Sequence, residues 1–199
     1  VCDVAVQLSF SGTGNQVIDN LSDLNNGQYN NNYKVVATHT GSGSFVLNSY
    51  QNTEMKLKTV FDEIGNYEGE NLLYDGYTKD FLDVDLEIIT EGEWTVKIVP
   101  MAGSSTSTMT GTGDTVTRWV KDILGTSNVT FTYNGTDEFS LWKVIRNSSQ
   151  TLINSGTGPT TTTFSVYVPQ VDSYQIAFVV QGSGDWSIDF NLGAEITQY

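Results

Sequence analysis

The sequence predicts an all-β protein made of two tandem antiparallel β-sandwich modules, jelly-roll-like in type. Apolar and polar residues alternate with a period of two over many short stretches, and helical periodicity is almost absent. Clusters of Gly, Asn, Asp and Ser bound these stretches, as is typical of strands joined by turns. Two short glycine-containing patterns also occur twice, in the same order and about half a chain apart. Such self-similarity indicates a duplicated module.

The first module, residues 1–101, begins with the alternating apolar residues of stretch 4–10. Its later strands combine β-branched or aromatic residues with alternation, and turn residues bound each of them. They are expected at residues 33–38, 45–50, 55–61, 82–88 and 94–99.

The second module, residues 108–199, follows a segment at 101–107 in which Gly, Ser and Thr replace apolar residues. Its strands are expected at residues 116–124, 129–133, 139–145, 164–168, 174–180 and 186–192. About seven or eight short strands in each module favour a sandwich or a jelly roll.

The repeated patterns act as an internal alignment of the two modules. Residues 11–17 (SGTGNQV) return as 110–116 (TGTGDTV), and residues 92–96 (GEWTV) return as 184–188 (GDWSI). The shared glycines are expected where the backbone needs a positive φ or a close approach. Trp94 and Trp186 are expected in the cores, because both copies keep them. The Gly-x-Gly is no dinucleotide fingerprint, since no helix follows and the third glycine is missing.

The repeated pattern resembles a module found in exported bacterial and archaeal surface proteins. That module runs from Gly-x-Gly-x-x-Val through a Gly before Phe-x-Val/Leu to a closing Gly-x-Trp-x-Ile, matched here from Gly12 to Ile98 and from Gly111 to Ile188. The chain is also distantly similar to the secreted β-sandwiches of the pre-peptidase C-terminal class. The resemblance implies an extracellular sandwich with adhesive, targeting or structural duties, and it implies no catalytic residues.

Composition narrows the range of partners. The 23 acidic and 9 basic residues give a formal charge of −14, which repels nucleic acids and anionic membranes. No apolar run reaches the roughly 18 residues of a membrane span. Abundant Asn, Thr, Ser and Gly, scarce Lys and Arg, and a start at Val1 in place of Met predict a processed, extracellular protein. Four Asn-x-Ser/Thr sequons are candidate glycosylation sites: Asn20, Asn128, Asn134 and Asn147.

The sequence offers little for catalysis, so no enzyme is predicted. One histidine, His39, and one cysteine, Cys2, exclude a zinc site of Cys/His type. No nucleophile-elbow motif supports a triad around His39. With 23 acids, some carboxylate pair always lies at the separation of a glycosidase, so such a pair signals nothing. Cys2 has no intramolecular partner and is open to three interpretations, as a small structural residue, an intermolecular bridge or a lipid attachment.

Two binding sites are considered, each against a structural alternative. Asp83, Asp85 and Glu87 alternate with apolar residues on one strand, and such oxygen ligands suit Ca²⁺. The alternative is a solvated acidic face. Trp119 and Trp142 have no counterparts in the first copy, so they are candidates for stacking on a glycan or for core packing.

The first strand differs most between the copies. Val4, Val6, Leu8 and Phe10 form an apolar strand, whereas Gly103, Ser105, Ser107 and Met109 stand at the equivalent positions. The second sandwich is therefore expected to have an open edge. Two donors are available for it: the C-terminal tail through Ile196 and Tyr199, or the N-terminal strand of another copy, and the second donor builds a filament. The alternative is that this strand completes its own module. We thus expect a non-enzymatic surface filament subunit without a cofactor, or alternatively a secreted carbohydrate- or protein-binding adhesion module, for which both a Ca²⁺-dependent and a Ca²⁺-independent mode are open.

Overall fold

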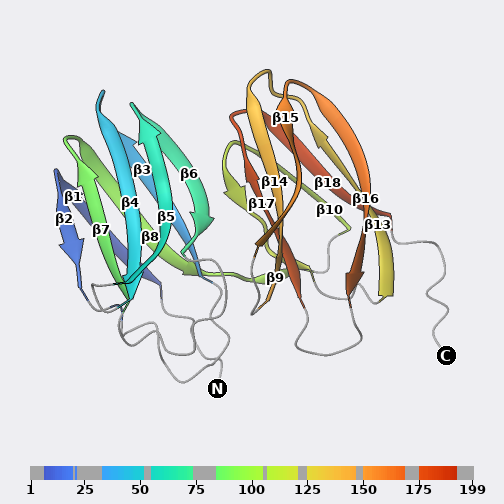
Figure 1. The fold of residues 1–199 in the computed structure, drawn as a ribbon, viewed down its shortest axis with the longest axis horizontal. Coiled ribbons are helices and arrows are strands. Elements are labelled where there is room, and N and C mark those ends of the chain that lie inside the picture. The colour runs from blue at the N-terminus through green and yellow to red at the C-terminus, as the bar shows by residue number, and fades with distance from the viewer. Residues whose placement is uncertain are drawn as a thin grey trace. The chain divides into compact units, whose positions relative to one another are not determined.

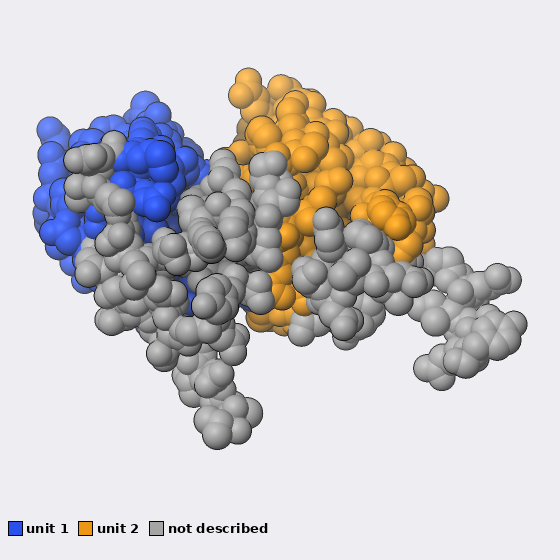
Figure 2. Space-filling view, turned by 60° about the horizontal axis from the view of Figure 1, so that its bottom comes forward, with its two compact units in different colours: residues 1–101, 147–149 blue, residues 102–146, 150–199 orange. Residues whose placement is uncertain are grey.

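The computed structural model describes residues 7–19, 21, 33–51, 55–73, 84–104, 107–120, 125–146, 150–168 and 175–191. They form two compact units, one from the described residues up to Met101 and the other from those that begin at Ala102 (Figure 2). All regular elements among them are strands. In this part of the chain there is no helix long and apolar enough to cross a membrane.

Unit 1 is an eight-stranded antiparallel sandwich (Figure 1). Its strands are β1 (Leu8–Thr13), β2 (Gln16–Ile18), β3 (Tyr33–Thr40), β4 (Ser44–Gln51), β5 (Met55–Ile64), β6 (Tyr67–Leu72), β7 (Val84–Thr90) and β8 (Glu93–Pro100). One sheet has the order β1-β8-β3-β6 and the other has the order β2-β7-β4-β5. This pair of orders is the jelly roll, in which consecutive strands alternate between two four-stranded sheets except for the hairpin of β4 and β5.

Unit 2 repeats the same topology. Its strands are β9 (Gly103–Ser104), β10 (Thr108–Thr112), β11 (Thr115–Val116), β12 (Trp119–Val120), β13 (Gly125–Tyr133), β14 (Glu138–Ile145), β15 (Gln150–Thr157), β16 (Thr160–Val168), β17 (Ile176–Gln181) and β18 (Asp185–Asn191). The sheet β10-β18-β13-β16 matches β1-β8-β3-β6 strand for strand. The second sheet has the strand order β15-β14-β17-β12-β9, and β11 also pairs with β17. The strands β11, β17, β14 and β15 therefore correspond to β2, β7, β4 and β5 of unit 1, and β12 and β9 are additional. The predicted fold class is therefore confirmed.

Each unit has its own core between its two sheets. In unit 1 the alternating residues of β3, β8 and β7 point inward, and Val35, Val96 and Leu86 are fully buried. In unit 2 Phe131, Leu141 and Phe178 occupy the same kind of position. The period of two in the sequence thus reports the faces that meet in each core.

The repeated glycine and tryptophan motifs form the same structure in both units. Trp94 on β8 is buried, and its Nε1 donates to the carbonyl oxygen of Gly14 at 3.0 Å. Gly14 itself has a φ of 74°, which favours glycine. Gly12 lies opposite Trp94 on β1, where an added Cβ would come 2.7 Å from the indole ring. In unit 2 Trp186 donates to Gly113 at 3.2 Å, so the expected core tryptophans and turn glycines are confirmed.

Two element predictions need correction. The stretch 116–124 is no continuous strand, because β11 and β12 are separate two-residue strands with Thr117 and Arg118 between them. The edge position next to β18, expected to be empty, is occupied by β10. Gly111 of β10 pairs with Trp186 as Gly12 of β1 pairs with Trp94, so the second unit has a first strand of its own.

Candidate functional site

His39 is buried at the end of β3 and joins two turns. Its Nδ1 lies 2.6 Å from the carbonyl oxygen of Gly65, and its Nε2 lies 2.8 Å from Thr90 Oγ1. Because a carbonyl only accepts, Nδ1 carries the proton and donates it to Gly65. The imidazole also stacks on Phe45, with ring centroids 5.2 Å apart. Both ring nitrogens are therefore used to fix the β5–β6 and β7–β8 turns.

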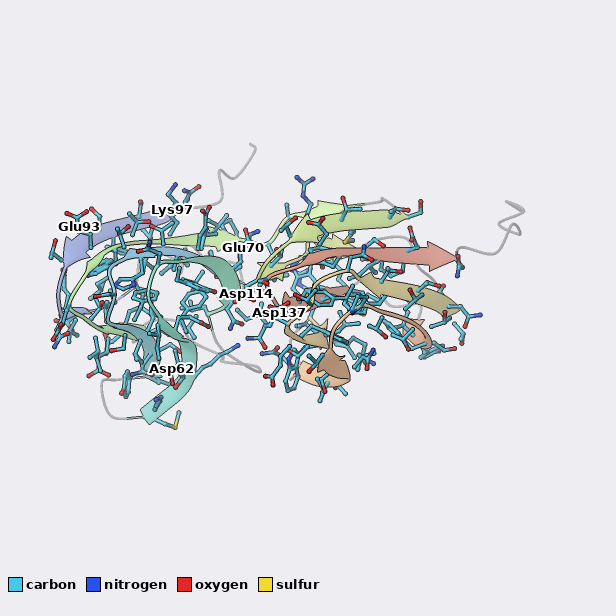
Figure 3. All side chains as sticks on the ribbon, turned by 90° about the horizontal axis from the view of Figure 1, so that it is seen from above. Asp62, Glu70, Glu93, Lys97, Asp114 and Asp137 are labelled. Atoms are coloured by element: carbon cyan, nitrogen blue, oxygen red, sulfur yellow. The ribbon has the colours of Figure 1, made fainter. Side chains whose placement is uncertain are left out.

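Tyr133 takes the place of His39 in unit 2. Its hydroxyl donates to Asp137 Oδ1 and accepts from the Gly184 amide at 3.1 Å. Asp137 is labelled in Figure 3. Its Oδ2 accepts from the Ser183 amide at 2.9 Å. The hydrogen bond from Tyr133, followed by those from Ser183, lowers the pKa of Asp137 to about 2. Burial, followed by the hydrogen bond to Asp137, raises the pKa of Tyr133. The network ties the β13–β14 and β17–β18 turns together.

A hydrogen-bonded polar group links β4, β5 and β7 in unit 1. Thr59 Oγ1 donates to Asn48 Oδ1 at 3.1 Å, and Asn48 Nδ2 donates to Glu87 Oε2 at 3.0 Å. Tyr50 donates its hydroxyl to the same Glu87 oxygen at 2.9 Å, which raises the pKa of Tyr50. This carboxylate oxygen is thus already held by two protein donors.

The arrangement changes the interpretation of the acidic strand. Asp85 is buried at 6% exposure, so it is no member of a solvated acidic face. Asp83 lies outside the described residues. Within the described ranges, no three His, Cys, Asp or Glu side chains gather as a metal site would require. The pattern correctly predicted that Val84, Leu86 and Ile88 share the core face. On the other face of β7, Asp85 is buried, Glu87 is half-buried and Ile89 is exposed.

The two tryptophans proposed to stack on a glycan do not form a joint exposed surface. Trp119 is 4% exposed, because β12 lies within the sheet between β17 and β9. Of the two alternatives for Trp119, its burial therefore supports core packing. Trp142 on β14 is half-buried, and its Nε1 donates to Ser140 Oγ at 2.9 Å. Burial thus removes Trp119 from solvent, whereas Trp142 keeps part of its surface exposed.

The candidate donor strand belongs to its own unit over the part that is described. Leu8 and Phe10 lie on β1 and pack against the core of unit 1. Val4 and Val6 lie outside the described residues, as does Cys2. Since β10 fills the equivalent edge of unit 2, the two premises of the predicted strand exchange, a free strand and an empty edge, are not met there.

Two of the four sequons are described. Asn128 is exposed on β13, and its Oδ1 accepts from Ser165 Oγ at 2.9 Å. Asn134 is exposed in the turn after β13. Asn20 and Asn147 lie outside the described residues. Asn134 is the better placed acceptor of these two, because its side chain leaves a turn and not a sheet face.

An open depression of about 350 Å³ lies on the outer face of the sheet β1-β8-β3. It is lined by hydroxyls and one carboxylate, from Ser11, Thr13, Thr38, Thr40, Thr95 and Glu93. Thr38 and Thr95 hydrogen-bond to each other across the strands at 2.7 Å. Figure 3 shows Glu93 and Lys97 on this outer face, pointing away from the core. The sequence patterns gave no sign of this depression, since it exists only once β1 and β3 flank β8.

We call β5 and β6 of unit 1, and β15 and β16 of unit 2, the lateral strands, because each of them lies at the edge of its sheet. These strands differ sharply in charge between the two units. In unit 1, β5 and β6 together carry six charged residues: Lys56, Lys58, Asp62, Glu63, Glu68 and Glu70. In unit 2, the equivalent strands β15 and β16 carry none. Sequence analysis missed this contrast, although a signal exists, because no charged residue occurs between Arg146 and Asp172. The charge-free lateral strands become meaningful once the topology places both at sheet edges.

No protein-family model and no curated protein sequence matches the chain. Among solved structures, it is similar to the insecticidal delta-endotoxin Cry8Ea1 from Bacillus thuringiensis, with 9% identity and a TM-score of 0.27. The match covers 81% of this chain and 42% of the endotoxin chain. A TM-score this low defines no common fold.

Proposed function

We propose that this chain is a non-enzymatic structural protein of an extracellular surface assembly, and that it self-associates through exposed sheet edges. The observation that carries the proposal is the absence of charge from β15 and β16, in a chain of formal charge −14. Charged side chains on edge strands are a common way to prevent edge-to-edge pairing. Unit 1 has them on the equivalent strands, and unit 2 does not.

A structural role also agrees with how the polar side chains are used. His39, Tyr133 and Asp137 are the kind of residues that serve catalysis elsewhere, but here each one holds turns of its own unit. Side chains whose polar atoms are hydrogen-bonded within the unit make the turns that they hold rigid. The proposed role requires no metal or cofactor. The exposed sequon at Asn134 is offered as the first glycan attachment site to examine.

The proposal is tested by measuring the mass of the full chain in solution over a wide concentration range. Light scattering after size exclusion, with negative-stain electron microscopy of the same fractions, is expected to show dimers or larger species. A chain that stays monomeric at the highest soluble concentration would contradict the assembly role.

A second candidate function is a carbohydrate-binding adhesion module, and the open depression on unit 1 favours it. Neighbouring hydroxyls with a carboxylate suit a hydroxyl-rich ligand. Retention on a glycan array is expected to fall in Thr95→Leu. The matched control is Ser187→Leu, because Ser187 occupies the equivalent position on β18. Equal retention by both variants, or no retention by the wild type, would contradict this role.

A further inference from the structure

We propose that β16 is the assembly edge, and that it pairs antiparallel with β16 of a second copy of this chain. The inference rests on the proposed assembly function and identifies the strand and the partner. The partner strand is β16 of a second copy, because an identical strand has the same length, the same absence of charge and the same side-chain pattern as β16 itself.

Strand β16 has the properties of an edge that is open to pairing. It runs for nine residues, TTTTFSVYV, without a charge, a glycine or a proline. Its register with β13 continues without a bulge from Thr160 to Val168. A straight edge of this length spans about 30 Å and presents alternate main-chain N–H and C=O groups outward. β-branched residues and aromatics make it a strong strand.

The other edges of the described sheets are poorer candidates. β15 has a bulge opposite Leu141 and Trp142 and contains Gly156. β1 and β10 have only six and five residues, and each contains a glycine. Because paired strands gain main-chain hydrogen bonds along their common length, β16 gains most from another β16.

The equivalent edge in unit 1 shows how the same fold prevents such pairing. β6 places Glu68 and Glu70 on the outer face, and Lys34 binds Glu70 at 2.7 Å. Asn71 of β6 also reaches across to β5, where its Nδ2 donates to the carbonyl oxygen of Val60 at 2.8 Å. β6 is therefore charged, short and tied laterally.

The outer face beside β16 is also neutral, so two copies can approach. Threonine pairs join β13 and β16, with Thr130 and Thr163 oxygens 3.2 Å apart and those of Thr132 and Thr161 3.3 Å apart. The carboxylates of this sheet, Asp185 and Asp189, lie on β18, and β13 separates β18 from β16. Tyr167 is 65% exposed at one end of the edge, where it adds apolar area to a dimer.

The pairing is isologous, because the same strand is used on both sides of a two-fold axis. It closes a dimer and leaves the edges β1 and β10 outside it. A filament then requires a second contact between such dimers. The inference therefore predicts that the dimer is the unit from which larger species grow.

The test places a charge on this edge in the full chain. Thr163→Lys and Thr163→Glu each bring two like charges within one or two strand positions across the dimer axis, which weakens association by up to roughly fivefold for each like-charged pair. The matched controls are Thr110→Lys and Thr110→Glu, because Thr110 is exposed on the opposite edge strand of the same sheet. Tyr167→Glu is a second edge variant whose exposed side chain is not needed for folding. Sedimentation velocity measures the dissociation constant, and circular dichroism reports the fold.

The outcomes separate the two proposals. If the wild type associates, the Thr163 and Tyr167 variants associate more weakly and the Thr110 variants associate as the wild type does, β16 is the edge. If the wild type and the Thr163 and Tyr167 variants associate equally, the β16 inference is wrong and the assembly role stands. If the wild type is monomeric throughout, both are wrong.

Discussion

Replacing Tyr133 by Phe tests whether the network around it holds unit 2 together. The ring stays in place, since Tyr133 is fully buried and its ring centroid lies 4.8 Å from that of Phe139. The variant loses the hydrogen bond to the Asp137 carboxylate and the acceptor for the Gly184 amide. A hydrogen bond to a charged group contributes about 1.5–3 kcal/mol, so we expect a loss of about 2–3 kcal/mol in the unfolding free energy of unit 2. For a unit of this size, that lowers its Tm by roughly 8–24 °C.

The pH dependence gives an independent measure of the same network. The pKa of Asp137 is lowered from 3.8 to about 2 in the folded chain. A carboxyl with a depressed folded pKa adds stability above its unfolded pKa, and this stability disappears as the pH falls from about 4 to about 2. In Tyr133→Phe the pKa of Asp137 rises toward its ordinary range. The loss of unit 2 stability between pH 4 and pH 2 is therefore expected to become shallower.

The assay is hydrogen exchange read by mass spectrometry, because peptides of unit 1 serve as an internal control in the same sample. Titration of the Asp137 carboxyl by NMR supplies the pKa. Tyr167→Phe is the matched control, since this tyrosine is 65% exposed and its loss is expected to change stability by less than about 0.5 kcal/mol. The reasoning is refuted if Tyr133→Phe exchanges like the control.

Three further predictions concern unit 1. Gly12→Ala places a Cβ 2.7 Å from the Trp94 ring, so overpacking is expected to destabilise the unit by about 1–3 kcal/mol in thermal unfolding. Lys34→Ala removes the ion pair with Glu70, whose two side chains are each 22% exposed, so we expect the free energy of unfolding to fall by less than about 1 kcal/mol. A larger loss in urea unfolding at low salt would contradict this expectation. Asn71→Leu deletes the buried amide that joins β6 to β5, and we expect faster hydrogen exchange confined to these strands, with a loss of about 1–3 kcal/mol.

The fold could be predicted because its signals are local and repeated. Alternation identified most long strands, and the Gly and Trp motifs mark the same two strand ends in both units. The strand β10 could not be predicted in this way. Its sequence TMTGT has one apolar side chain, Met109, and it is a strand because its main chain pairs with β18 beside Trp186. Main-chain pairing leaves little trace in side-chain pattern.

The candidate sites were harder to predict, because exposure depends on both faces of a sheet. A strand with one apolar face normally has the other in water. In β17 all residues from Ile176 to Val180 are buried, and in β7 even Asp85 is. Trp119 lies on the strand beside β17 and is buried as well. A period-2 pattern does not show whether the outer face of a strand is also covered, so the burial of Trp119 and Asp85 could not be predicted from it.

The comparison of the two units also argues that the neutrality of β16 is not imposed by the fold. Both units close the same jelly roll, and unit 1 does so with six charges on its lateral strands. The topology therefore tolerates charge at these positions. In a chain with 23 acidic residues, a lateral pair of strands without any charge is a departure that packing within unit 2 does not require. In the proposed assembly, contact with another strand edge is the physical setting in which a charge at these positions is costly.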